Sequence, residues 1–173
     1  MNPRQVFEAR VLPHLDAAYN LARWLLRDER AAEDAVQEAS LRAFRYLDAL
    51  RDGDARPWLL GIVRNTCFTL LESRRQAPPV AEFDEAAFEA ELAHTEPPAR
   101  LQQQRTKLAV DAAIRALAPP LREVIVLREL EELEYAQIAA IAGVPIGTVM
   151  SRLHRAREQL RRALSLSRLG PMS

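Results

Sequence analysis

The stretch that decides the fold runs from Pro119 to Leu164 and reads PPLREVIVLRELEELEYAQIAAIAGVPIGTVMSRLHRAREQLRRAL. Near its centre, apolar residues recur at three- and four-residue steps, as they do on one face of a short helix: Tyr135, Ile138, Ile141 and Ala142. Gly143 and Pro145 interrupt the pattern, because Gly ends a helix readily and Pro starts the next. A second apolar period follows: Val149, Leu153, Ala156 and Leu160. The stretch therefore predicts two helices joined by a tight turn, a helix-turn-helix.

The second of these helices has a cationic side opposite its apolar stripe. Between Thr148 and Arg168 there are six Arg and one acid, Glu158, so this stretch carries +5 while the whole chain is neutral. Concentrated positive charge on such a helix is typical of contact with DNA phosphates. An Arg-rich helix face that is merely solvated remains the alternative at this point.

The composition predicts an all-α protein with two small helical domains. Ala, Leu, Arg and Glu dominate the 173 residues, Gly is scarce, and no strand-like alternation persists. Residues 76–104 hold one Arg and six acids, and this part is rich in Pro. We therefore expect an N-terminal domain at 1–76, an acidic linker at 77–99 and a helix-turn-helix domain at 100–168.

The N-terminal part predicts three helices around one small core. The first covers 4–27 with an interruption at Pro13, and the second covers 30–50 with Asp28 as its N-cap. The third is expected to start at Pro57 and to end at 75. In the second helix, Phe44 belongs to the apolar positions and is expected to face inward.

Several functional classes find no support in the sequence. Cys67 is the single cysteine and the three His are scattered, so we expect no disulfide, metal site or cofactor. No nucleophile and base pair has catalytic spacing, which argues against an enzyme. Without a signal peptide or a long apolar run, we expect a cytoplasmic protein with no membrane insertion.

Two separated blocks of sequence resemble one known family. Residues 34–38 (DAVQE), followed by Phe44, resemble the second conserved region of bacterial sigma-70-type initiation factors. Residues 56–59 (RPWL) and 62–65 (IVRN) resemble the segments after it. Residues 117–157, with LAPPLR, QIA, GVP, GTV, SRL and RAR in order, are similar to the fourth region. Because the first and third regions are absent, the chain resembles the extracytoplasmic-function (ECF) subgroup.

The resemblance implies binding to core RNA polymerase and to promoter DNA. It implies that the second helix docks on the polymerase clamp through polar residues suited to a basic surface: Glu33, Asp34, Gln37 and Glu38. It implies that a loop and the following helix contact the minus-10 element: Asp52, Gly53, Asp54, Trp58, Arg64 and Asn65. For Trp58, core packing is the favoured alternative to base stacking. For Asp34 and Glu38, the alternative is that acids near a helix start suit its dipole.

The resemblance also assigns the minus-35 element to the second helix of the helix-turn-helix. Its candidate contacts are Thr148, Ser151, Arg152, His154, Arg155 and Arg157. We expect Arg155 and Arg157 to contact phosphates, and base edges to be contacted by Ser151, Arg152 or His154 near the start of the helix. Family members often carry Arg at Met150, and Met offers a guanine only an apolar contact.

A sigma-like mimic that sequesters an anti-sigma factor without binding promoters is the main alternative. A mimic is expected to lose its DNA-facing arginines, whereas this chain keeps them: Arg64, Arg152, Arg155 and Arg157. A simple helix-turn-helix repressor would leave the N-terminal part unexplained. From the resemblance alone we expect an anti-sigma factor among the partners.

Overall fold

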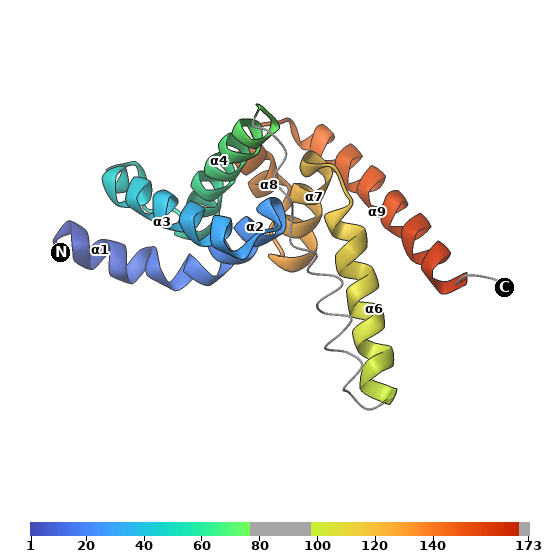
Figure 1. Ribbon diagram of the computed structural model, residues 1–173. Helices are drawn as coiled ribbons and strands as arrows, with labels where there is room; N and C mark the ends of the chain where they lie inside the picture. The colour runs from blue at the N-terminus through green and yellow to red at the C-terminus, as the bar shows by residue number, and fades with distance from the viewer. Residues whose placement is uncertain (77–97, 170–173) are drawn as a thin grey trace.

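The computed structural model describes residues 1–76 and 98–169, and within these ranges every regular element is a helix (Figure 1). The predicted linker therefore lies almost wholly outside the described residues. The N-terminal half contains four α-helices and two short 3-10 turns, at Leu12–His14 and Leu47–Ala49. Its helices are α1 (Pro3–Arg10), α2 (Leu15–Leu26), α3 (Glu29–Arg45) and α4 (Ala55–Gln76). The all-α prediction is confirmed.

Local sequence signals place most ends of these helices. The predicted break at Pro13 falls in the turn between α1 and α2. Arg27 ends α2 in the left-handed conformation at φ 57°, and the Asp28 carboxylate then caps α3 by accepting from the Arg30 amide at 2.9 Å. The third helix begins two residues earlier than predicted, because Asp54 accepts from the Arg56 amide at 3.0 Å and starts it there.

The C-terminal half contains the predicted helix-turn-helix. Its elements are α6 (Pro98–Arg115), α7 (Pro119–Ile125), a π-helical turn (Val126–Leu130), α8 (Tyr135–Ala142) and α9 (Ile146–Leu169). Gly143 ends α8 at φ 68°, a left-handed conformation that Gly adopts more readily than other residues. The chain bends by 98° between α8 and α9, within the range of helix-turn-helix motifs.

The two halves share one apolar core, which the sequence did not indicate. α4 packs against α8, and α2 packs against α7. Fully buried side chains from both halves belong to one continuous cluster, including Leu25 and Val63 from the first half and Val124 and Ile138 from the second. The predicted boundaries at 1–76 and 100–168 stay a prediction, and in this structure the halves lie together (Figure 1).

Two further searches concern the described residues only. No single helix among them is long and apolar enough to cross a membrane, although the bent pair Tyr135–Ala142 and Ile146–Ser165 passes by length and composition. No group of three or more His, Cys, Asp or Glu side chains in the described ranges could hold a metal ion.

Candidate nucleic-acid interface

The cationic face of α9 stands out from the core as predicted. Val149, Leu153 and Ala156 are buried beneath it, whereas Ser151 and Arg155 are exposed. His154 is also exposed, while the remaining candidates are half-buried: Thr148, Arg152 and Arg157. The helical period thus places all six candidate minus-35 contacts outside the core, on sides of α9 that a ligand can reach.

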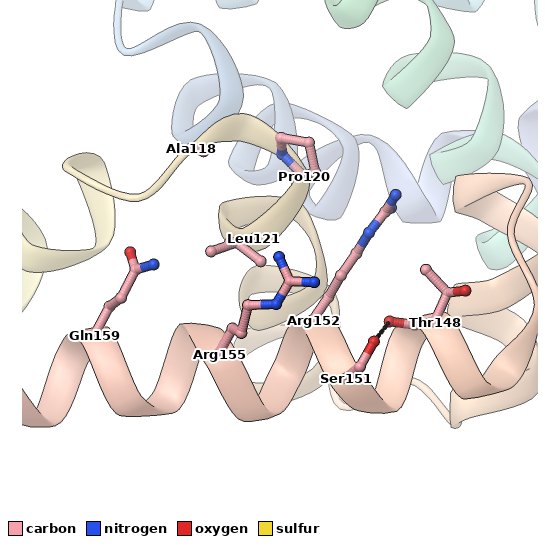
Figure 2. A pocket seen from close by; sticks show the side chains of 8 residues that line it. All are labelled: Ala118, Pro120, Leu121, Thr148, Ser151, Arg152, Arg155 and Gln159. Carbon is pink, nitrogen blue, oxygen red and sulfur yellow. Dashed lines mark hydrogen bonds between the residues drawn. The ribbon is translucent and has the colours of Figure 1, made fainter.

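A hollow of about 510 Å³ lies between α9 and the start of α7 (Figure 2). Arg152 and Arg155 project from α9 into it, beside Ser151, whose hydroxyl donates to the Thr148 carbonyl at 3.1 Å. The other lining residues are Ala118, Pro120, Leu121 and Gln159. Two guanidinium groups beside a hydroxyl suit an anionic oxygen. The sequence grouped Arg152 with His154, but the structure groups Arg152 with Arg155, because His154 does not line this hollow.

The arginines of α9 differ in what they already contact. Arg157 donates from Nη2 to Glu129 Oε1 at 2.8 Å, and this hydrogen bond raises the pKa of Arg157. Arg155 has no hydrogen-bond or ion-pair partner among the described residues. A ligand phosphate would therefore meet a free guanidinium at Arg155, whereas at Arg157 it would compete with a carboxylate.

The loop of the predicted minus-10 site is exposed, and Arg10 holds its backbone in place. Arg10 donates from Nη2 to the carbonyls of Arg51 and Gly53, at 2.7 Å each. Asp52, Gly53 and Asp54 are all exposed, and the Asp54 carboxylate is used to cap α4. This loop offers exposed polar groups on a fixed backbone, which a displaced base requires of its binding site.

The aromatic residue of this site packs into the protein. Trp58 is half-buried and lies against the apolar core cluster. This position agrees with core packing, and base stacking by Trp58 stays a prediction.

Arg64 is turned inward, although the sequence assigned it to DNA. Its Nε donates to Glu123 Oε1, and its guanidinium lies 4.0 Å from the centre of the Phe68 ring. Glu123 is fully buried in α7. Asn65, the neighbouring candidate, is exposed. Sequence analysis missed Glu123, and the available signal was an acid inside the apolar run of residues 121–127.

The predicted polymerase-binding residues form one exposed face of α3. Glu33, Asp34, Gln37 and Glu38 are all exposed, opposite a buried stripe of small residues: Ala32, Ala35, Ala39 and Ala43. Glu38 accepts from Arg42 at 2.9 Å, an exposed pair that contributes little to stability.

Two apolar residues on α3 are exposed: Leu41, which sequence analysis did not consider, and Phe44, which it expected to face inward. Leu41 is 72% exposed, and Phe44, expected to face inward, is 46% exposed. The expectation that Phe44 is a core residue is therefore wrong; its ring forms a T-shaped pair with that of Phe7, with centroids 5.6 Å apart. Leu41 follows Gln37 by four residues and Glu38 by three, so it lies on the same helix face as these two side chains. Exposed apolar side chains beside polar ones are typical of protein-binding surfaces.

Comparison with known proteins covers both halves. The family description "Sigma-70 region 2" matches residues 11–77, and "Sigma-70, region 4" matches residues 107–160. The RNA polymerase sigma-H factor of Pseudomonas aeruginosa is 34% identical over 168 residues, covering 93% of this chain and 87% of the relative. The ECF RNA polymerase sigma-E factor of Escherichia coli K12 is 39% identical over 136 residues, covering 73% of this chain and 70% of the relative.

A mycobacterial relative is longer than this chain. The ECF RNA polymerase sigma factor SigE of Mycolicibacterium smegmatis is 33% identical over 154 residues, which cover 87% of this chain and 58% of the relative. The chain thus matches little more than half the length of that protein.

Solved structures share the fold. The sigma factor RpoE of Bartonella quintana, solved with the anti-sigma factor NepR, superimposes with a TM-score of 0.70 at 24% identity, over 92% of this chain and 97% of that one. CnrH, solved with the cytosolic domain of CnrY, gives 0.67 at 24% identity, over 94% and 89%. At this identity the likeness concerns the fold alone. Because the two family regions and the relatives together span both halves, the chain belongs to the sigma-70 family, among its ECF RNA polymerase sigma factors.

Proposed function

We propose that this protein binds core RNA polymerase and directs it to specific promoters. The observation that carries the proposal is the hollow beside α9, where Arg155, which has no partner among the described residues, stands next to Arg152 and Ser151 on a helix-turn-helix. The relatives from Pseudomonas aeruginosa and Escherichia coli are named sigma factors. The role is one of binding and positioning, with no reaction and no cofactor assigned to this chain.

Each candidate surface has a distinct task in this proposal. The polar face of α3 binds the polymerase clamp through Glu33, Asp34, Gln37 and Glu38, with Leu41 adding apolar contact. The loop at 52–54 and the start of α4 contact the minus-10 element, with Asn65 and, once it is released from Glu123, Arg64. The minus-35 element lies against α9, where Arg155 binds a phosphate and Ser151 or Arg152 contacts base edges.

The remaining partners follow from the same role. One neighbouring solved structure contains a sigma factor in complex with an anti-sigma factor, and we propose an anti-sigma factor as a partner here too. Because transcription in bacteria takes place in the cytoplasm, we propose that the protein acts there. Arg155 is exposed and has no counter-ion among the described residues, which favours promoter binding over the sigma-mimic alternative, because a mimic has no use for a free phosphate-binding group.

Transcription with purified components tests the proposal. The full chain is mixed with core polymerase and a promoter library, and run-off products are sequenced against core polymerase alone. We expect discrete new start sites that share two upstream elements. A chain that binds an anti-sigma factor but yields no start sites, even though it copurifies with core polymerase, would support the mimic and overturn the proposal.

A further inference from the structure

The first two turns of α9 carry an apolar edge, defined here as Ile146, Gly147 and Met150. Within the described part of α9, Ile146 and Met150 are the large apolar side chains that are exposed, at 45% and 53%. They lie four residues apart, so they are neighbours on the helix surface. Neither belongs to the apolar core or to the side chains packed against it. The apolar edge is therefore open to an external partner.

Gly147 leaves the backbone bare in the middle of this edge. A Cβ atom at Gly147 would meet no other part of the chain within 4 Å, and among the glycines that the structure describes only Gly143 has a positive φ. Neither packing nor backbone conformation therefore requires Gly at position 147, although Gly stabilises a helix less than Ala does. A bare backbone lets a partner come closer to the helix than a side chain would. Close approach by a partner gives Gly147 a physical reason.

The apolar edge adjoins the cationic side of the same helix. At about 100° per residue, its three residues fall within one sector of about 100°, and Ser151 follows in the next. Arg155 and Arg152 lie beyond Ser151, at the hollow beside α7 (Figure 2). A ligand that covers the start of α9 must offer anionic oxygens to one side and an apolar group to the other. The major groove of DNA offers both, because phosphates line its rims and the C5 methyl group of thymine projects into it.

We propose that Met150 and Ile146 select thymine in the minus-35 element by packing against its C5 methyl group, while Gly147 lets the base edge approach the helix. This inference rests on the proposed function and specifies which base the same site reads. The methyl contact is favourable because it removes apolar surface of both partners from water.

The other bases are disfavoured by what these two side chains lack. Guanine presents two acceptors to the major groove, and adenine and cytosine each present an amino donor. Ile146 has no polar side-chain atom, and the Met150 thioether is a weak acceptor that cannot donate. Any of these bases would exchange hydrogen bonds with water for an apolar surface, which costs free energy. Thymine is the base that gains a contact at this edge.

Replacing thymine by deoxyuridine tests the contact, because the exchange removes the C5 methyl group and leaves every hydrogen-bonding atom in place. The probe is the strongest promoter recovered from the transcription library, with each minus-35 thymine replaced in turn. Holoenzyme is assembled from core polymerase and the full chain, and its binding is measured by fluorescence anisotropy. We expect at least one replacement to weaken wild-type binding about four-fold, the effect of exposing one methyl-sized group to water.

Variants of exposed residues connect this effect to α9. Met150→Ala should bind the thymine and deoxyuridine promoters with equal affinity at the affected position, and Ile146→Ala should reduce the difference. Leu12→Ala is the matched control and should keep the full difference, because Leu12 is 43% exposed in the turn before α2, outside every proposed binding surface. Met150→Arg should shift the preferred base from thymine to guanine by about ten-fold, because a guanidinium donates to both guanine acceptors.

The outcomes separate this inference from the proposed function. Discrete start sites from wild-type holoenzyme, combined with a minus-35 element that lacks thymine or tolerates deoxyuridine throughout, would overturn the inference and leave the proposed function standing. An unchanged difference in both Met150→Ala and Ile146→Ala would also overturn it, since another residue would then contact the methyl group. Absence of promoter-specific transcripts would overturn the proposed function and this inference with it. If circular dichroism shows that Met150→Ala fails to fold, Met150→Arg decides, because a retained thymine preference there refutes the contact.

Discussion

Replacing Arg155 with Ala should remove one phosphate contact from the promoter complex. The structure gives the reason: Arg155 is exposed, lines the hollow beside α9 and has no partner among the described residues. Its guanidinium is therefore fully available to release a counter-ion from DNA. One lost phosphate contact lowers the slope of log affinity against log salt by about 0.9. Between 50 and 200 mM salt, wild type should lose about 3.5-fold more affinity than Arg155→Ala.

The assay is promoter binding by holoenzyme, measured by fluorescence anisotropy at several salt concentrations and on a series of minus-35 substitutions. Arg157→Ala is the matched comparison. Because Arg157 already pairs with Glu129 at 2.8 Å, its loss should change the slope by less than that of Arg155. An unchanged slope in Arg155→Ala, together with relaxed selectivity at one base pair and a cost of about 1–3 kcal/mol, would mean that Arg155 contacts a base edge. If neither measurement changes, the wrong face of α9 has been placed in the groove.

Three further predictions concern other surfaces and the core. Asp34→Arg combined with Glu38→Arg should abolish capture of core polymerase while circular dichroism stays unchanged, because both side chains are exposed; capture at wild-type levels would reject this surface. Ser151→Ala or His154→Ala should alter the preferred minus-35 sequence in transcription assays, and a preference identical to wild type in both would exclude them from base contact. Burial raises the pKa of the Cys67 thiol from 9.0, its ordinary value, to about 12. The free energy of unfolding should therefore fall above pH 9 by about 1.4 kcal/mol per pH unit. Urea titrations of wild type and Cys67→Ala, which should lack this component, measure the difference; equal alkaline losses would refute it.

The sequence by itself determined the helices, their ends and their faces. Asp28 caps α3, Gly143 ends α8 at positive φ, and Pro13 breaks the first helix, as local rules predict. The polar face of α3 and the cationic face of α9 followed from helical spacing. These features depend on residues within a few positions of one another, so the order of the chain is sufficient to place them.

Only the tertiary structure decided which of these side chains are available. Arg64 is bound by Glu123, 59 residues away in sequence, and Arg122 donates to the carbonyl of Leu25, 97 residues away. Phe44, apolar and expected to face inward, is 46% exposed, and its ring forms a T-shaped pair with that of Phe7. Such pairings depend on which helix faces meet and on the charges that this contact removes from water. No local pattern records either, because burial is a property of the packed chain and not of neighbouring residues.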